Sequence, residues 1–239
     1  MKSSIAQKFI QDFIVDDRWR FIFKGLGITL EVTFLSLIFG LIIGLIVGII
    51  RCAHDQSGKG GSSFKKIVLG ALNLICRLYI TVIRGTPTLV QLLIMYFVIL
   101  VSAKSKVYVA VVTFSINSGA YVAEIIRGGI MSIDKGQMEA GRSLGLNYVR
   151  TMIRIVIPQA LKACLPAMVN ELITLLKETS ICGYIGLNEL TRGGDIIRGT
   201  TFDALLPLLT VALIYLVLVL ILTYFMSLIE NKLRKSDMQ

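Results

Sequence analysis

Long apolar runs separated by short polar segments dominate the chain. Each run holds about 20 residues or more, which is the length that an α-helix needs to cross the hydrocarbon core of a bilayer. This pattern predicts an all-α integral membrane protein with five crossings, and an odd number places the two termini on opposite sides. The predicted spans are residues 25–50, 67–103, 107–127, 159–181 and 204–229.

Residues 1–24 precede the first span and have a different pattern. Apolar residues recur there at helical spacing with charges between them, and Trp19 lies near the end. The spacing predicts an amphipathic helix over 5–22 at the membrane surface, with Trp19 at headgroup level. The alternative is a poorly ordered terminus.

Glycines mark one face of the first span. Gly40, Gly44 and Gly48 recur every fourth residue and therefore lie on the same side of a helix. Because glycine has no side chain, a neighbouring helix can approach closely along this face.

The second apolar run is interrupted. Arg77 and Arg84 fall within it, and Gly85-Thr86-Pro87 follows. Proline removes a backbone donor and restricts the preceding residue, so a helix should kink or stop there. Two short spans or one long, interrupted span are possible, and the length of each half favours the second. The break then falls near mid-membrane, where irregular backbone must line a cavity or pack against protein.

The composition excludes an ordinary soluble domain. The 239 residues are 55% hydrophobic with a mean hydropathy of +0.77. The net charge of +10 would suggest nucleic acid as the partner of a soluble protein. Here the basic residues lie in short links between apolar runs, which is typical of anchoring at anionic lipid headgroups, and no nucleic-acid partner is expected.

The distribution of Lys and Arg predicts the orientation. Segments 51–66, 128–158 and 230–239 share one face and hold twelve of these residues if Arg127 at the boundary is included. The polar links 104–106 and 182–203 on the opposite face hold four. The positive-inside rule therefore places the carboxyl terminus in the cytoplasm and the amino terminus outside. Five Lys/Arg within residues 1–24 oppose this assignment.

Signatures of catalysis and metal binding are missing from the sequence. The four cysteines are far apart, and His54 is the only histidine. The glycines and lysine of loop 51–66 do not match a phosphate-binding loop, and no strand precedes them. We therefore expect neither a bound metal nor a cofactor in this chain, and no enzymatic activity of its own. An intramembrane enzyme is a further alternative.

The polar loop 128–158 contains a compact pattern. Asp134 is a good helix cap with Gln137 three residues later, and Gly145 is a typical helix stop, so a short helix over 135–144 is predicted. Glu139 and Arg142 provide charged side chains, while the small residues Ala140 and Gly141 keep the helix narrow. Such a helix suits a partner's cleft, although an ordinary interfacial helix has the same spacing.

This loop resembles the EAA loop of bacterial ABC importer permeases. The family pattern is Glu-Ala-Ala, three residues, Gly, nine residues, Ile, one residue and Leu-Pro. The chain has Glu139-Ala140-Gly141, Gly145 and Ile155-Val156-Ile157-Pro158, so that Gly141 replaces the second alanine and Ile157 the leucine.

Three further motifs resemble the polar amino acid permeases, the histidine, glutamine, arginine and opine group. They are Arg84-Gly85-Thr86-Pro87-Thr88-Leu89-Val90-Gln91, Asn117-Ser118-Gly119-Ala120-Tyr121-Val122-Ala123-Glu124-Ile125 and Leu176-Lys177-Glu178-Thr179-Ser180. The resemblance runs from about residue 25 to 229 and departs from the family at Cys182-Gly183-Tyr184.

The resemblance implies the type I ABC importer permease fold, with the helix in 128–158 as a cytoplasmic coupling helix. It implies a bacterial cytoplasmic-membrane permease paired with a second permease subunit, identical or closely related. Two ATP-binding subunits would bind ATP and Mg and would grip Glu139, Ala140, Gly141, Arg142 and Gly145. An extracellular or periplasmic binding protein would deliver a polar amino acid for import by alternating access.

Five residues are candidates for substrate binding. Two of them are ionisable, and ionisable groups inside a membrane are costly and therefore functional by default. Arg84 suits the carboxylate of an amino acid, and Glu178 suits an ammonium. Asn117 and Ser180 offer neutral hydrogen bonds, and Gln91 lies two turns beyond Arg84. A structural ion pair between Arg84 and Glu178 is the competing interpretation.

An ATP-independent channel or facilitator for small polar solutes is the alternative function. It would not need the coupling helix.

Overall fold

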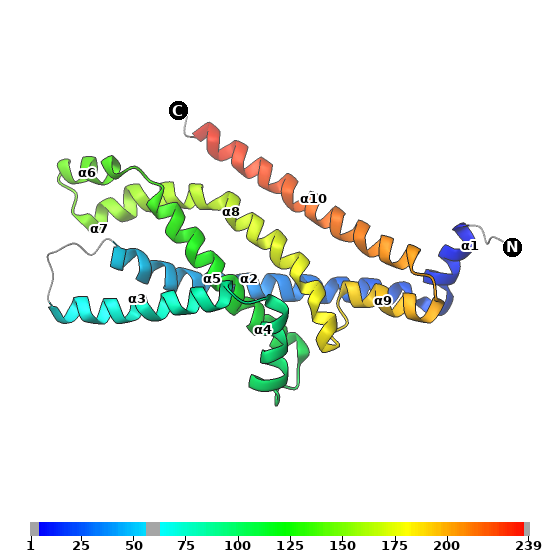
Figure 1. Cartoon of the computed structure of the whole chain (residues 1–239). Helices are drawn as coiled ribbons and strands as arrows, with labels where there is room; N and C mark the ends of the chain where they lie inside the picture. Colours follow the sequence, from blue (N-terminus) through cyan, green and yellow to red (C-terminus); the bar gives the residue numbers. More distant parts are fainter. Residues whose placement is uncertain (1–4, 56–62, 237–239) are drawn as a thin grey trace. The chain divides into compact units, whose positions relative to one another are not determined.

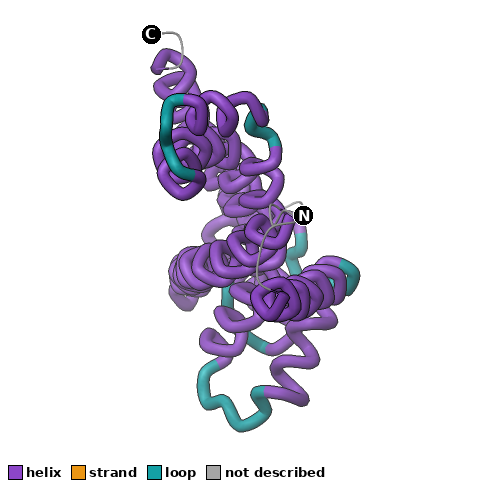
Figure 2. The backbone as a smooth tube through the Cα atoms, turned by 90° about the vertical axis from the view of Figure 1, so that its left-hand side faces the viewer, coloured by secondary structure: helices purple, strands orange, loops and turns teal. Residues whose placement is uncertain are grey.

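The computed structural model describes residues 5–55 and 63–236, and every element in them is helical (Figures 1 and 2). Five helical stretches are long and apolar enough to cross a membrane, which confirms the predicted fold class. They are Trp19–Asp55, Lys66–Arg84, Lys106–Met131, Tyr148–Ile185 and Leu205–Ile229. The helices in chain order are α1 (Ile5–Phe9), η1 (Ile10–Ile14), η2 (Val15–Asp17), α2 (Trp19–Asp55), α3 (Ser63–Arg84), α4 (Thr88–Ile94), η3 (Met95–Ile99), α5 (Lys106–Met131), α6 (Lys135–Ser143), α7 (Tyr148–Thr151), η4 (Met152–Val156), α8 (Ile157–Glu178), η5 (Thr179–Ile185), α9 (Leu190–Thr201) and α10 (Leu205–Ser236).

The amino-terminal segment differs from a single helix over 5–22. The helical path is interrupted at Asp16 and Asp17, which have φ of 56° and 53°. Aspartate tolerates this left-handed conformation better than most residues because its short side chain can bond locally. Trp19 therefore begins α2 and does not end an amphipathic helix.

The interruption expected within 67–103 is present. Helix α3 ends at Arg84, and α4 begins at Thr88 after Pro87, whose extended backbone has φ −64° and ψ 134°. Residues Lys66–Arg84 alone are long enough to cross, whereas Thr88–Ile99 is a shorter apolar helix.

The chain forms two compact units. Unit 1 consists of the described residues up to Leu37, of Pro87–Phe114 and of Leu172–Tyr224. Unit 2 consists of the described residues in Ile38–Thr86, of Ser115–Glu171 and of the described residues from Phe225 onward.

Unit 1 has two apolar clusters. The first is centred on Phe114, Leu92 and Leu175, which are almost fully buried. In the second, Phe13 of η1 packs with Ile22, Leu190, Ile197 and Val211. The second cluster therefore holds the amino-terminal segment against α9 and α10.

Helix α9 lies in segment 182–203, where the sequence indicated only a polar link. Its cap is Glu189, whose carboxylate accepts from the backbone N–H groups of Thr191 and Arg192, both at 2.7 Å. A Cβ at Gly193 would lie 2.6 Å from the Phe21 carbonyl oxygen, so glycine permits this close approach. The contact with Phe21 comes from a residue distant in sequence, and local propensity does not reveal it.

The glycine face predicted on α2 contacts α5 in unit 2. A Cβ at Gly40 would lie 3.0 Å from Ser118 Cβ, one at Gly44 2.4 Å from Val122 Cγ1, and one at Gly48 3.2 Å from Ile126 Cγ2. The absence of side chains on this face thus allows the two helices to pack closely.

Replacing Gly44 with alanine is expected to destabilise the protein by about 1–3 kcal/mol, because the added methyl overlaps Val122 and lies 3.0 Å from the Ala123 backbone nitrogen. Gly27 on the same helix has nothing within 4 Å of a Cβ. Thermal unfolding in detergent should therefore show a lower Tm for Gly44→Ala only. Equal Tm values for both variants would contradict this packing.

Candidate functional site

Helix α6 forms as the sequence predicts. It spans Lys135–Ser143, and the Asp134 side chain caps it by accepting from the Gly136 backbone N–H at 2.6 Å. Gly145 follows with φ of 82°, the left-handed conformation that glycine adopts readily. Gln137 does not face back toward the cap, because its Oε1 accepts from Gln159 Nε2 at 3.2 Å. The side chain of Gln137 thus ties α6 to α8 within unit 2.

Gly141 is the contact point between α6 and the following helical turns. It is buried, and a Cβ there would lie 2.5 Å from Thr151 Cγ2 and 3.0 Å from Ile155 Cδ1. The Thr151 methyl therefore occupies the space that an alanine at position 141 would need. Glycine allows α6 to lie close against α7 and η4.

The other side of α6 is open. Glu139, Ala140, Arg142 and Gly145 are exposed, and Leu144 has 82% of its surface accessible. Beside the helix, Tyr148, Val149 and Ile153 are also exposed. This exposed surface combines apolar anchors with charged residues, as protein interfaces commonly do.

A cavity of about 430 Å³ lies beside α6 in unit 2. Glu139 and Arg142 line it with Asp55, Met138 and Tyr148. Glu139 and Arg142 of α6 therefore share this cavity with Asp55, which belongs to α2.

An ion network joins the ends of α2 and α5. Glu124 pairs with Arg51 and, at 3.2 Å, with Arg127, which also lies 3.7 Å from Asp55. Glu124 and Arg127 of α5 thus both pair with residues of α2. The roles of Arg51 and Asp55 were missed, because no local pattern connects residues more than seventy positions apart.

Three of the predicted substrate residues belong to unit 1. Glu178 at the end of α8 is partly buried and accepts a long hydrogen bond of 3.5 Å from Thr88 at the start of α4. Gln91 lies on α4 and Ser180 on η5, both partly buried. The break at Pro87 thus brings the start of α4 to the Glu178 carboxylate.

The other two predicted substrate residues, Arg84 and Asn117, belong to unit 2. Arg84 is exposed at the end of α3, with its guanidinium carbon 5.0 Å from the centre of the Tyr121 ring. This cation–π contact fixes the head group over α5. Asn117 lies on α5 with only 3% of its surface exposed.

Ser180 lines a cavity of about 310 Å³ in unit 1, together with Glu189, Arg192 and Asp195. Burial raises the pKa of Glu189, although bonds from Thr191, Arg192 and Tyr215 act in the opposite direction. Hydrogen bonding to Arg198 lowers the pKa of Asp195. The cavity thus contains the buried carboxyl of Glu189 and the partly buried, paired carboxylate of Asp195.

Glu189→Gln is expected to flatten the pH dependence of stability. Because folding raises the pKa of Glu189, its contribution is fully present below the unfolded pKa and is lost as pH rises through the folded pKa. Wild type should therefore gain stability relative to Glu189→Gln as pH falls from about 8 to about 5. Parallel Tm curves over this range would show that Glu189 does not titrate differently on folding.

Residues 67–235 match the family described as "Binding-protein-dependent transport system inner membrane component". The chain belongs to this family, and the resemblance to ABC importer permeases is thereby confirmed.

Two curated relatives and one solved structure show the extent of the similarity. The chain is 42% identical over 220 residues to the arginine transport system permease protein ArtQ of Bacillus subtilis, covering 91% of this chain and 94% of that protein. It is 36% identical to the putative glutamine transport system permease protein GlnP of Rickettsia felis, covering 89% and 93%. A crystal structure of an amino acid ABC transporter with histidines has a TM-score of 0.81 at 37% identity, covering 97% of this chain and 100% of that one.

Proposed function

We propose that the chain is the membrane-spanning subunit of an ATP-driven importer that moves a polar amino acid into the cytoplasm. The observation that carries this proposal is the capped, exposed helix α6 in a chain similar to permeases named for arginine and glutamine. The substrate class comes from those names and from the motifs containing Arg84, Asn117 and Glu178.

In this proposal α6 transmits the movement of the ATP-binding subunits to the membrane helices. Two ATP-binding subunits bind ATP and Mg, and each receives one α6 through Glu139, Ala140, Arg142 and the exposed Leu144. A second permease subunit completes the membrane part. Closure of the ATP-binding subunits shifts the permease between inward-open and outward-open states, and hydrolysis resets it.

The orientation follows from charge. The basic loops support an orientation with α6 and the carboxyl terminus in the cytoplasm and the amino terminus outside. The turn between α9 and α10 then faces the binding protein that delivers the substrate.

Uptake by the assembled transporter tests the proposal. Vesicles containing the chain, its ATP-binding subunits and its binding protein should accumulate at least one of labelled arginine, glutamine, histidine or cystine, only with ATP inside the compartment that represents the cytoplasm. Deleting 135–145 should abolish uptake and release the ATP-binding subunits. Uptake that continues without ATP, or without this helix, would instead indicate a facilitator.

A further inference from the structure

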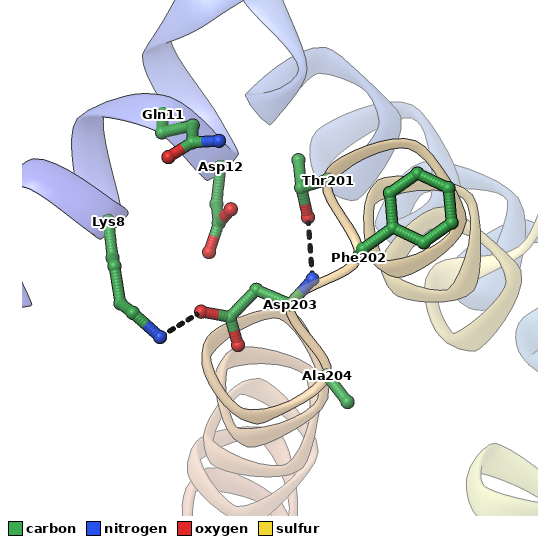
Figure 3. Close-up of a pocket in the computed structure, with 7 residues that line it drawn as sticks. All are labelled: Lys8, Gln11, Asp12, Thr201, Phe202, Asp203 and Ala204. Atoms are coloured by element: carbon green, nitrogen blue, oxygen red, sulfur yellow. Dashed lines mark hydrogen bonds and ion pairs between the residues drawn. The ribbon is translucent and has the colours of Figure 1, made fainter. Parts of the chain in front are cut away.

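A second polar cavity lies in unit 1, away from the residues proposed for transport. Its volume is about 250 Å³, and it lies between the amino-terminal segment and the turn that joins α9 and α10 (Figure 3). The residues that line it are Lys8, Gln11, Asp12, Thr201, Phe202, Asp203 and Ala204.

Asp12 is the unusual member of this cavity. Its side chain is on η1, only 1% of the residue is exposed, and the carboxylate points toward Asp203 and Lys8 (Figure 3). Within residues 5–55 and 63–236, its Oδ2 atom has no hydrogen-bond partner. A buried carboxylate oxygen without a donor is costly, so this position favours a positively charged ligand.

The other charged groups of the cavity already have partners. Lys8 Nζ lies 2.8 Å from Asp203 Oδ2, and the Leu205 backbone N–H donates to Asp203 Oδ1 at 2.9 Å. These contacts lower the pKa of Asp203 and keep it ionised. One ammonium thus faces two carboxylates, and the lining carries one uncompensated negative charge.

We propose that this cavity binds one monovalent metal cation, of sodium or potassium size, with Asp12 as its charged ligand. Gln11 and Thr201 also line the cavity. The Thr201 hydroxyl, which donates to the Ile197 carbonyl at 2.9 Å and accepts from the Asp203 backbone N–H at 3.3 Å, keeps one lone pair for a cation. A divalent ion is a poorer fit, because Ca²⁺ takes six to eight oxygens, commonly from several carboxylates, and Asp203 is already paired. The bound ion would hold the amino-terminal segment against the α9–α10 turn.

The inference is independent of transport, so the test measures binding to the purified full-length chain in nanodiscs. Wild type should bind radioactive sodium or rubidium saturably, at about one ion per chain, and its Tm should be higher in that salt than in N-methylglucamine chloride at equal ionic strength. Asp12→Asn should weaken binding by about tenfold or more and remove the salt effect on Tm.

Two further variants sharpen the result. Asp16→Asn is the matched control, because Asp16 is an exposed aspartate of the same segment, paired with Arg18 at 2.7 Å, and it should bind like wild type. Lys8→Met should bind the ion more tightly, because it removes a competing positive charge. The absence of saturable binding of both ions to wild type would overturn the proposal even if Asp12→Asn did not fold, as would unchanged binding by a folded Asp12→Asn protein.

Discussion

Gly141→Ala is expected to reduce ATP-driven uptake about 5- to 30-fold. Its added methyl would lie 2.5 Å from Thr151 Cγ2, on a β-branched side chain that has little freedom to move. Such overlap costs about 1–3 kcal/mol, whereas the gain in helix propensity is at most about 1 kcal/mol. The helix should therefore shift away from α7 and η4, and fewer complexes should present α6 correctly to the ATP-binding subunits.

The substitution Thr151→Ser should restore uptake to the Gly141→Ala variant. Serine keeps the hydroxyl, which donates to the Asn147 carbonyl at 3.1 Å, and removes only the Cγ2 methyl that overlaps. The double variant Gly141→Ala with Thr151→Ser should recover most of the lost uptake, because the effects of substitutions at two residues in contact are not additive. If both single variants and the double variant transport like wild type, the packing of α6 against Thr151 does not matter for coupling.

Glu178→Gln is expected to raise the KM for uptake about ten- to hundredfold. The neutral amide keeps the shape of the side chain but removes the charge that would bind a substrate ammonium, and a hydrogen bond to a charged group contributes about 1.5–3 kcal/mol. Initial rates of uptake at increasing substrate concentration, with binding protein in excess, measure this effect.

Glu171→Gln is the control, because it makes the same chemical change earlier in helix α8. Its KM should stay near that of wild type. If Glu178 instead serves only as a structural partner of Arg84, Glu178→Gln and Arg84→Gln should each lower Tm and leave KM unchanged. That result would remove both residues from the substrate site.

Elements specified by local pattern were predictable from the sequence. The five apolar stretches, the interruption at Pro87 and the short helix between Asp134 and Gly145 all depend on residues close together in the chain. Hydrophobic length, the missing proline N–H and helix capping act locally, and so each leaves a readable signal.

Elements specified by distant contacts were not predictable in the same way. Helix α9 contains Gly193 and Gly194, which disfavour a helix, and it depends on the burial of Glu189 and on close contact with Phe21. The unpaired Asp12 and the fit between Gly141 and Thr151 likewise become visible only when separate segments are packed together. The residues proposed for substrate binding stay predictions for the experiments above.

Site-specific photo-crosslinking tests the central claim most directly. A photoreactive residue at Arg142, which is exposed on α6, should form a covalent adduct with an ATP-binding subunit in native membranes, identifiable by mass spectrometry. The same probe at Thr200, which is exposed on α9, should form no such adduct. Adducts at position 142 with lipid alone, and no ATP-binding protein among the products, would contradict the assignment of α6 as the coupling helix.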